Sequence, residues 1–180
     1  MRKLLFLIAF SILVILSIFI YLFYKGIYGA NVKLEEPQTY FYIKTGQTYE
    51  EVFQNLKENN YLNSPRSFDL LAQKMNYPSH VYAGCYLLKD GMSNRELILI
   101  LRSGEQVTFD FTIKKERQLK SIAERAANTF ELKEDSLLYL LKNPSQIIGL
   151  EAYNKHTIKC IFLPDTYEFY WNTNAESFLK

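Results

Sequence analysis

The longest apolar stretch in the chain lies at its N-terminus. From Leu4 to Tyr24 the sequence has no charged residue, and an α-helix of this length crosses a hydrocarbon core of about 30 Å. A secretory signal peptide has a shorter apolar core followed by a small-residue cleavage site, and Gly29-Ala30 leaves cleavage open as an alternative. The pattern predicts one transmembrane helix.

The charges that flank this stretch indicate its orientation. Arg2 and Lys3 precede it, and only Lys25 follows closely. Because positive residues concentrate on the cytoplasmic side, residues 1–25 are predicted to be a cytoplasmic N-terminus and membrane anchor. The rest of the chain is then expected outside the cytoplasm.

Regular structure is predicted to begin after a linker. Residues 26–38 mix Gly, Pro and charges without a period, as linkers do. The segment 40–43 is β-prone, and Thr48 with Glu51 forms the pattern of a capping box at the start of a helix.

A second helix and a second strand complete a small module. Ser64 and Pro65 are typical of the first positions of a helix, and residues 84–88 read as a short strand. The order is therefore βααβ. A third helix is predicted between Ser93 and Gly104, where helices commonly stop, so that the module spans residues 39–105.

Strict alternation from Val107 to Ile113 predicts a strand with one buried face, which opens a second domain over residues 106–180. Apolar spacing predicts helices over 119–130 and 137–141, and a further helix begins at 175–179. Because the sequence stops within that last pattern, we expect this domain to be truncated. The fold class is α+β.

Charge and cysteine content restrict the function. The net charge of +2 includes Arg2, Lys3 and Lys25; the remainder carries 18 basic and 19 acidic residues, a net charge of −1. A near-neutral domain is not an electrostatic trap for nucleic acid. Cys85 and Cys160 could pair in an oxidising compartment, or remain two separate buried thiols, and the sequence leaves both open.

Common catalytic motifs are absent from the sequence. His80 and His156 lie far apart without metal-ligand spacing, and neither a Gly-rich phosphate loop nor a Gly-x-Ser-x-Gly element occurs. The sequence therefore shows no metal site and gives little support to nucleotide-dependent or serine-esterase chemistry.

One segment is dense in both carboxylates and aromatic rings. Residues 162–172 read FLPDTYEFYWN, and a saccharide groove combines aromatic rings for sugar faces with polar groups for hydroxyls. The same residues also suit a turn followed by core packing, so residue chemistry alone leaves groove and core open.

This segment resembles the Pro-Asp-Thr-Tyr element of the endolytic murein transglycosylases, the MltG or YceG-like family. The context is similar to the N-terminal part of that family: one membrane span, a LysM-like βααβ module, and the elements Ala83-Gly84-Cys85-Tyr86 and Gly91-Met92-Ser93 in the same order. The helix from Glu96 to Leu101, ending at Ser103-Gly104, also agrees. The resemblance covers the chain after Lys25.

The resemblance implies a lyase that cleaves MurNAc-GlcNAc bonds in nascent glycan strands and leaves 1,6-anhydroMurNAc ends. A single glutamic acid would do this chemistry without a cofactor. The implied location is the bacterial inner membrane, with peptidoglycan as substrate and peptidoglycan synthases as further candidate partners. Alternatives are a non-catalytic peptidoglycan-binding module and a synthase tether.

The site residues follow from the same resemblance. Family members carry the catalytic Glu in a Glu-Lys-Glu segment downstream of the Pro-Asp-Thr-Tyr element, which we expect beyond Lys180, so no catalytic residue is assigned here. Asp165, Thr166 and Tyr167 are expected to support or line the site. Glu168 follows these residues directly and is a further candidate for the site. The alternative is that Glu168 occupies a helix or turn with its carboxylate in water and has no role in the site.

Overall fold

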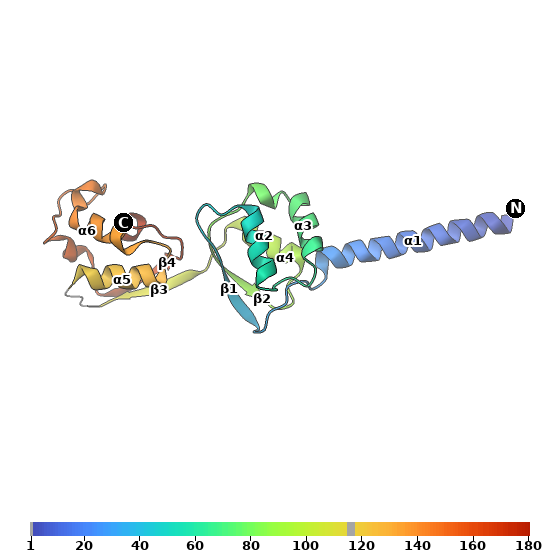
Figure 1. Cartoon of the computed structure of the whole chain (residues 1–180), viewed down its shortest axis with the longest axis horizontal. Helices are drawn as coiled ribbons and strands as arrows, with labels where there is room; N and C mark the ends of the chain where they lie inside the picture. The colour runs from blue at the N-terminus through green and yellow to red at the C-terminus, as the bar shows by residue number, and fades with distance from the viewer. Residues whose placement is uncertain (1, 115–117) are drawn as a thin grey trace. The chain divides into compact units, whose positions relative to one another are not determined.

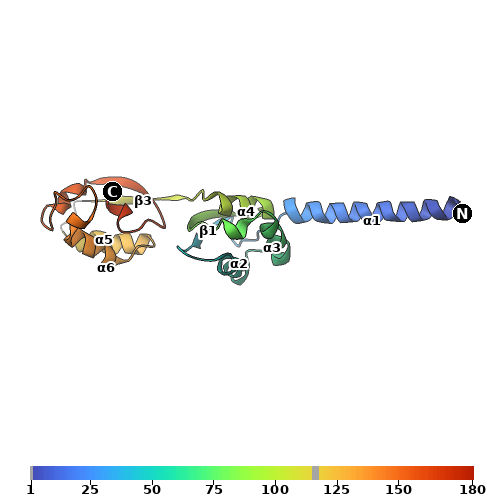
Figure 2. The same cartoon turned by 90° about the horizontal axis from the view of Figure 1, so that it is seen from above.

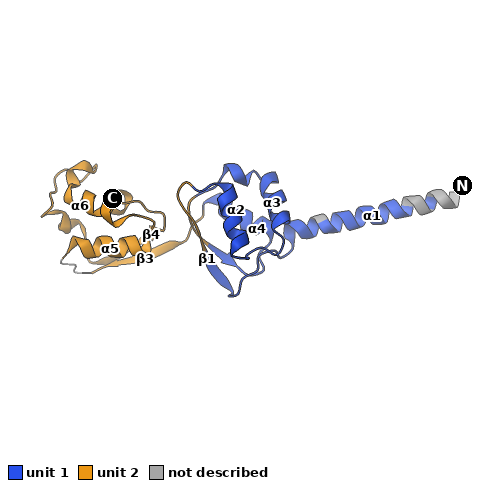
Figure 3. Ribbon diagram, in the orientation of Figure 1, with its two compact units in different colours: residues 1–40, 47–82, 87–104 blue, residues 41–46, 83–86, 105–180 orange. Residues whose placement is uncertain are grey.

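The computed structural model describes residues 2–114 and 118–180, which form two compact units (Figure 3). The first unit contains the chain up to Tyr40 together with residues 47–82 and 87–104. The second contains residues 41–46, 83–86 and 105–180. Both helices and strands are present, as the sequence predicts.

The elements of the first half follow the predicted βααβ order (Figure 1). They are α1 (Arg2–Tyr28), β1 (Gln38–Ile43), α2 (Tyr49–Glu58), α3 (Pro65–Lys74), a 3₁₀ turn (Tyr77–Ser79), β2 (Gly84–Lys89) and α4 (Asn94–Ser103). Strands β1 and β2 pair in a two-stranded sheet. The helices bury apolar faces, with Leu56, Phe68 and Leu97 fully buried.

Local hydrogen bonds begin and end these helices where the sequence indicates. The Thr48 N–H donates to Glu51 Oε2 at 2.7 Å, and the Glu51 N–H donates to Thr48 Oγ1. Ser93 and Glu96 form the same capping box before α4. Gly104 ends α4 in the left-handed region at φ +73°, which a residue without Cβ adopts at little cost.

The predicted linker over residues 26–38 is wrong in its first half. Helix α1 continues to Tyr28, and the side chains of Asn31 and Val32 are buried. Ala30 and Val32 form β-bridges with Ser93 and Leu62. This stretch therefore belongs to the first unit, because Val32 gains an apolar environment and Asn31 gains hydrogen-bond partners there.

Helix α1 contains one segment, Phe10–Tyr28, that is long and apolar enough to cross a membrane. None of that segment is buried by the rest of the protein. A helix with exposed apolar side chains on every side suits a lipid environment.

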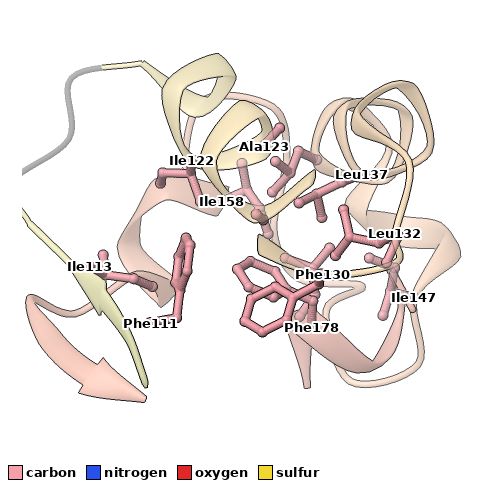
Figure 4. Close-up of a cluster of buried hydrophobic side chains, with 14 residues drawn as sticks. Phe111, Ile113, Ile122, Ala123, Phe130, Leu132, Leu137, Ile147, Ile158 and Phe178 are labelled. Carbon is pink, nitrogen blue, oxygen red and sulfur yellow. The ribbon is translucent and has the colours of Figure 1, made fainter. Parts of the chain in front are cut away.

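The second unit packs two helices against a two-stranded sheet. Its remaining elements are β3 (Thr108–Ile113), α5 (Leu119–Thr129), α6 (Glu134–Lys142), 3₁₀ turns at Pro144–Gln146 and Ile158–Ile161, β4 (Asp165–Tyr170) and a 3₁₀ turn at Ser177–Leu179. Figure 4 shows its core, where Phe111, Phe130 and Phe178 meet beside Ile122 and Leu137. Aromatic pairs of this kind add to the stability that apolar burial provides.

Two features of this unit differ from the sequence prediction. Residues Asp165–Tyr170 form strand β4. For this segment the sequence allowed either a saccharide groove or a turn followed by core packing, and it did not predict a strand. Within residues 175–179, Ser177–Leu179 forms a single 3₁₀ turn instead of a regular helix, with Ala175, Phe178 and Leu179 buried. The apolar side chains of this segment reach the core although no α-helix forms there.

Candidate functional site

All four predicted site residues lie on β4, whose pairing with β3 fixes the face that each one occupies. The two strands run antiparallel, with Thr112 opposite Thr166 and Asp110 opposite Glu168. Residues directly opposite one another project to the same side of a sheet, and the side alternates along each strand. The four candidates therefore divide between two faces.

Thr166 and Glu168 lie on the exposed face. We call this face the polar ladder, and it consists of Thr108, Asp110, Thr112, Thr166, Glu168 and Tyr170. The Thr112 and Thr166 hydroxyls are 2.9 Å apart and share a hydrogen bond. Hydroxyls, carboxylates and a phenol thus follow one another on a solvent-exposed surface.

Tyr167 and Asp165 belong to the opposite face. The Tyr167 ring packs against the hydrophobic core, and its hydroxyl donates to the Leu163 carbonyl oxygen at 3.1 Å. Asp165 stays exposed at the end of the strand, where its Oδ1 accepts from the Thr166 N–H at 2.7 Å. Tyr167 therefore packs β4 against the core, whereas Asp165 makes only a local hydrogen bond.

Glu168 occupies a strand position, so the predicted helix or turn for this residue is wrong. The other part of that alternative, a carboxylate in water, is what the structure shows. Glu168 lies opposite Asp110, and neighbouring carboxylates on one sheet face repel each other. An exposed pair of this kind is available to accept hydrogen bonds from a hydroxylated ligand.

A shallow groove borders the polar ladder along β3. Its volume is about 440 Å³, and we call it the β3-edge groove. Its lining residues are Asp110, Phe111, Thr112, Lys114, Arg125, Asn128 and Thr129. Arg125 donates to the Thr112 carbonyl oxygen at 2.6 Å and places its guanidinium 4.9 Å from the centre of the Phe111 ring. The groove therefore combines one carboxylate, that of Asp110, with the basic side chains of Lys114 and Arg125.

A second hollow of about 500 Å³ lies in the same unit, bordered by Thr45, Glu131, Lys133, Asn172 and Glu176 among others. Both the N–H and the hydroxyl of Thr45 donate to the Glu131 carboxylate, at 2.8 and 2.6 Å. This hollow contains none of the four candidates.

Metal and thiol chemistry receive no support from the described residues. Within 2–114 and 118–180, no group of three or more His, Cys, Asp or Glu side chains could hold a metal ion. Cys85 is buried and Cys160 exposed, and both are free thiols, so the disulfide alternative is not formed and Cys160 is not the buried thiol anticipated. Burial raises the pKa of the Cys85 thiol to about 11.

The strand that carries the Pro-Asp-Thr-Tyr element lies inside the region of a family match. The sequence pattern of the YceG-like family matches residues 41–180. The chain belongs to the YceG-like family. The match begins within β1, includes β2, β3 and β4, and therefore contains the polar ladder of this YceG-like protein.

A solved structure is similar to this YceG-like chain. It is the crystal structure of a yceG-like protein from Listeria monocytogenes, with 21% sequence identity and a TM-score of 0.44. The match covers 79% of this chain and 51% of that one, so the present chain corresponds to about half of the Listeria protein. No curated protein matches the chain.

Sequence reasoning missed the groove-lining side chains on α5. The alternation over 107–113 did place Thr108, Asp110 and Thr112 on the polar side, but it gave no partner for them. Arg125 carried no motif that would single it out, because its role depends on the packing of α5 beside β3.

Proposed function

We propose that this YceG-like protein is a membrane-anchored endolytic lytic transglycosylase that cleaves MurNAc-GlcNAc bonds in nascent glycan strands. The family match over residues 41–180 carries the proposal. Helix α1 supports the anchoring, since it is long and apolar enough to span a membrane. In this arrangement the two compact units lie outside the cytoplasm, beside newly made peptidoglycan.

The reaction needs one acid and no added water. A glutamic acid protonates the leaving glycosidic oxygen while the bond from that oxygen to the MurNAc C1 breaks. The resulting carboxylate takes the proton of the sugar's own 6-hydroxyl, whose oxygen bonds to C1 and closes the 1,6-anhydro ring. The family places this acid in a Glu-Lys-Glu segment, which residues 1–180 do not contain.

The residues of the polar ladder are proposed to bind the glycan. Thr112, Thr166 and Glu168 offer hydroxyl and carboxylate oxygens to sugar hydroxyls, and Tyr170 offers an exposed ring to a sugar face. Tyr167 lies on the opposite face and packs β4 against the core. In this view Glu168 binds substrate and is not the acid.

The deciding experiment incubates purified glycan strands with this chain and, separately, with the longer product of its gene. The 1,6-anhydro ends that each one generates are counted by mass spectrometry. The longer product should generate them, and Glu→Gln in a Glu-Lys-Glu segment should abolish them. Glu168→Gln should raise KM about tenfold, as expected for one lost hydrogen bond to a charged group, with kcat retained. Exposed Lys155→Ala is the control.

Two outcomes would contradict this assignment. Reducing ends in place of anhydro ends would indicate a hydrolase. Complete loss of activity in Glu168→Gln, with binding of the glycan strands retained, would make Glu168 the acid and overturn its role as a binding residue.

A second candidate, a non-catalytic peptidoglycan-binding module, rests on a groove in the first unit. The groove has a volume of about 970 Å³, and amides and carboxylates line much of it: Glu35, Glu36, Asn59, Asn60 and Asn63. Such a surface can hydrogen-bond N-acetyl sugars. Sedimentation with insoluble sacculi tests this function, because Asn60→Ala with Asn63→Ala should lower the bound fraction, whereas Asn128→Ala in the second unit should not.

A further inference from the structure

The end of α1 is held by a buried polar network in the first unit. Asn94 is the first residue of α4, and its side-chain amide donates to the Gly26 carbonyl oxygen at 2.9 Å and to Ser67 Oγ at 3.0 Å. Its Oδ1 accepts from Asn31 Nδ2 at 2.6 Å. Asn94 is 1% exposed, and its hydrogen bonds connect α1, α3 and α4.

This junction lies close to the expected membrane surface. Gly26 follows Tyr24, the last residue of the uncharged span, by two residues, which is about 3 Å along a helix axis. A headgroup layer is about 5 to 7 Å thick on each side of the hydrocarbon core. The first turns of α3 and α4 therefore begin at headgroup depth when α1 spans a bilayer.

Helix α3 presents a basic and apolar stripe next to this junction. Arg66, Leu70 and Lys74 follow one another at helical spacing and are all exposed, whereas Phe68 and Ala72 on the other side are buried. Leu70 is 66% exposed, so the stripe offers an apolar side chain between two basic ones. Figures 1 and 2 show α3 beside the end of α1.

Further basic and aromatic groups surround the same end of α1. The Tyr24 and Tyr28 rings are 4.9 Å apart, and the Arg95 guanidinium of α4 lies 6.0 Å from the centre of the Tyr28 ring. Lys25, which lies between the two tyrosines in the sequence, is exposed. Tyrosine rings and basic side chains beside an apolar span are typical of the membrane interface.

We propose that the exposed stripe of α3, together with Lys25 and Arg95, is a docking surface for anionic phospholipid headgroups of the membrane that α1 spans. The basic groups are complementary in charge to anionic lipids, and Leu70 can enter the headgroup boundary. The surface is continuous with the anchor itself. This inference rests on the membrane anchoring proposed above and adds a fixed orientation of the first unit on the bilayer.

The test uses the 180-residue chain in vesicles of phosphatidylcholine with or without phosphatidylglycerol. Leu70→Cys is spin-labelled in a Cys160→Ser background, and contact with lipid is measured by oxygen and nickel-complex collision rates. Gln54→Cys, an exposed position on α2, is the matched control. Flotation of the chain with the vesicles reports membrane insertion separately.

The label at position 70 should be shielded from the nickel complex relative to the label at position 54, and more strongly when phosphatidylglycerol is present. Arg66→Glu with Lys74→Glu should remove most of the phosphatidylglycerol-dependent shielding while flotation persists. Equal exposure of both labels on floating vesicles overturns the docking surface and leaves the anchor intact. Failure to float overturns both, and shielding that does not change when phosphatidylglycerol is added overturns the anionic headgroup as the ligand.

Discussion

Asn31 and Asn94 share a buried hydrogen bond of 2.6 Å although 63 residues separate them in the chain. Asn31 also accepts from the Ser64 N–H at 2.6 Å and donates to the Ser64 carbonyl oxygen. One side chain thus binds the backbone at the start of α3, where the Ser64 side chain makes no capping bond. A substitution at either asparagine leaves buried polar groups without partners.

Asn94→Ala should therefore destabilise the first unit by about 1 to 3 kcal/mol. Hydrogen exchange of α3 and α4 amides, measured for the whole chain in detergent, reports the loss. Asn63→Ala changes an exposed asparagine of the same unit and should leave the exchange nearly unchanged. Equal effects of the two substitutions would show that the buried network contributes nothing special.

The Glu96 carboxylate should make the stability of α4 depend on pH. Hydrogen bonds from the Ser93 N–H and hydroxyl hold the pKa of Glu96 below its usual value, with a smaller contribution from Arg95. Because the folded pKa is depressed, this stabilisation is present above about pH 4.5 and is lost as pH falls through the folded pKa.

Carbon-13 NMR titration of the Glu96 carboxyl checks this directly, and Ser93→Ala should raise its pKa. In unfolding measurements across acidic pH, Glu96→Gln should flatten part of the pH dependence. Glu35→Gln removes one exposed carboxylate elsewhere and should not do so. An unshifted Glu96 titration would refute the capping role.

The two thiols should react at very different rates. Cys160 is exposed, whereas Cys85 is buried with its pKa raised to about 11 by burial. At about pH 8 only about a thousandth of such a thiol is ionised, and the thiolate is the reactive form. Iodoacetamide labelling followed by mass spectrometry should modify Cys160 in the native protein and Cys85 only after denaturation. Rapid native labelling in Cys160→Ser would contradict the burial of Cys85.

Gly84→Ala should destabilise the protein because a side chain meets the new methyl group. A Cβ at this position would lie 2.3 Å from Gln106 Cδ, and the glycine has φ +151°. Overpacking of this kind costs about 1 to 3 kcal/mol. Thermal or denaturant unfolding of Gly84→Ala, Gln106→Ala and the double variant separates the steric cost from the backbone cost. The double variant should recover the stability that Gly84→Ala loses through the clash with Gln106. No recovery would assign the cost to the backbone alone.

Much of the local structure followed from the sequence. The capping boxes of Thr48 and Ser93 placed the starts of α2 and α4, and Gly104 placed the end of α4, because these signals act over three or four residues. The alternation from Val107 to Ile113 identified β3 and its polar face. These features depend on backbone hydrogen bonds and side-chain period, which neighbouring residues set.

The candidate site was predicted only in part. The Pro-Asp-Thr-Tyr element drew attention to residues 165–168, but it did not show that Thr166 and Glu168 face solvent while Tyr167 packs against the core. That division depends on the partner strand, since Thr112 and Thr166 are 54 residues apart and the register between them fixes each face. Arg125 joined the site through the packing of α5 for the same reason.

The sequence by itself determined the long apolar helix, the capped helices, the polar side of β3 and the family resemblance, because each depends on residues that are close together in the chain. Only the tertiary structure decided that Asn31 is buried and not part of a linker, that β4 pairs with β3, and that Cys85 and Cys160 stay apart. Those outcomes depend on contacts between distant segments, whose free energy is gained only when the whole unit folds.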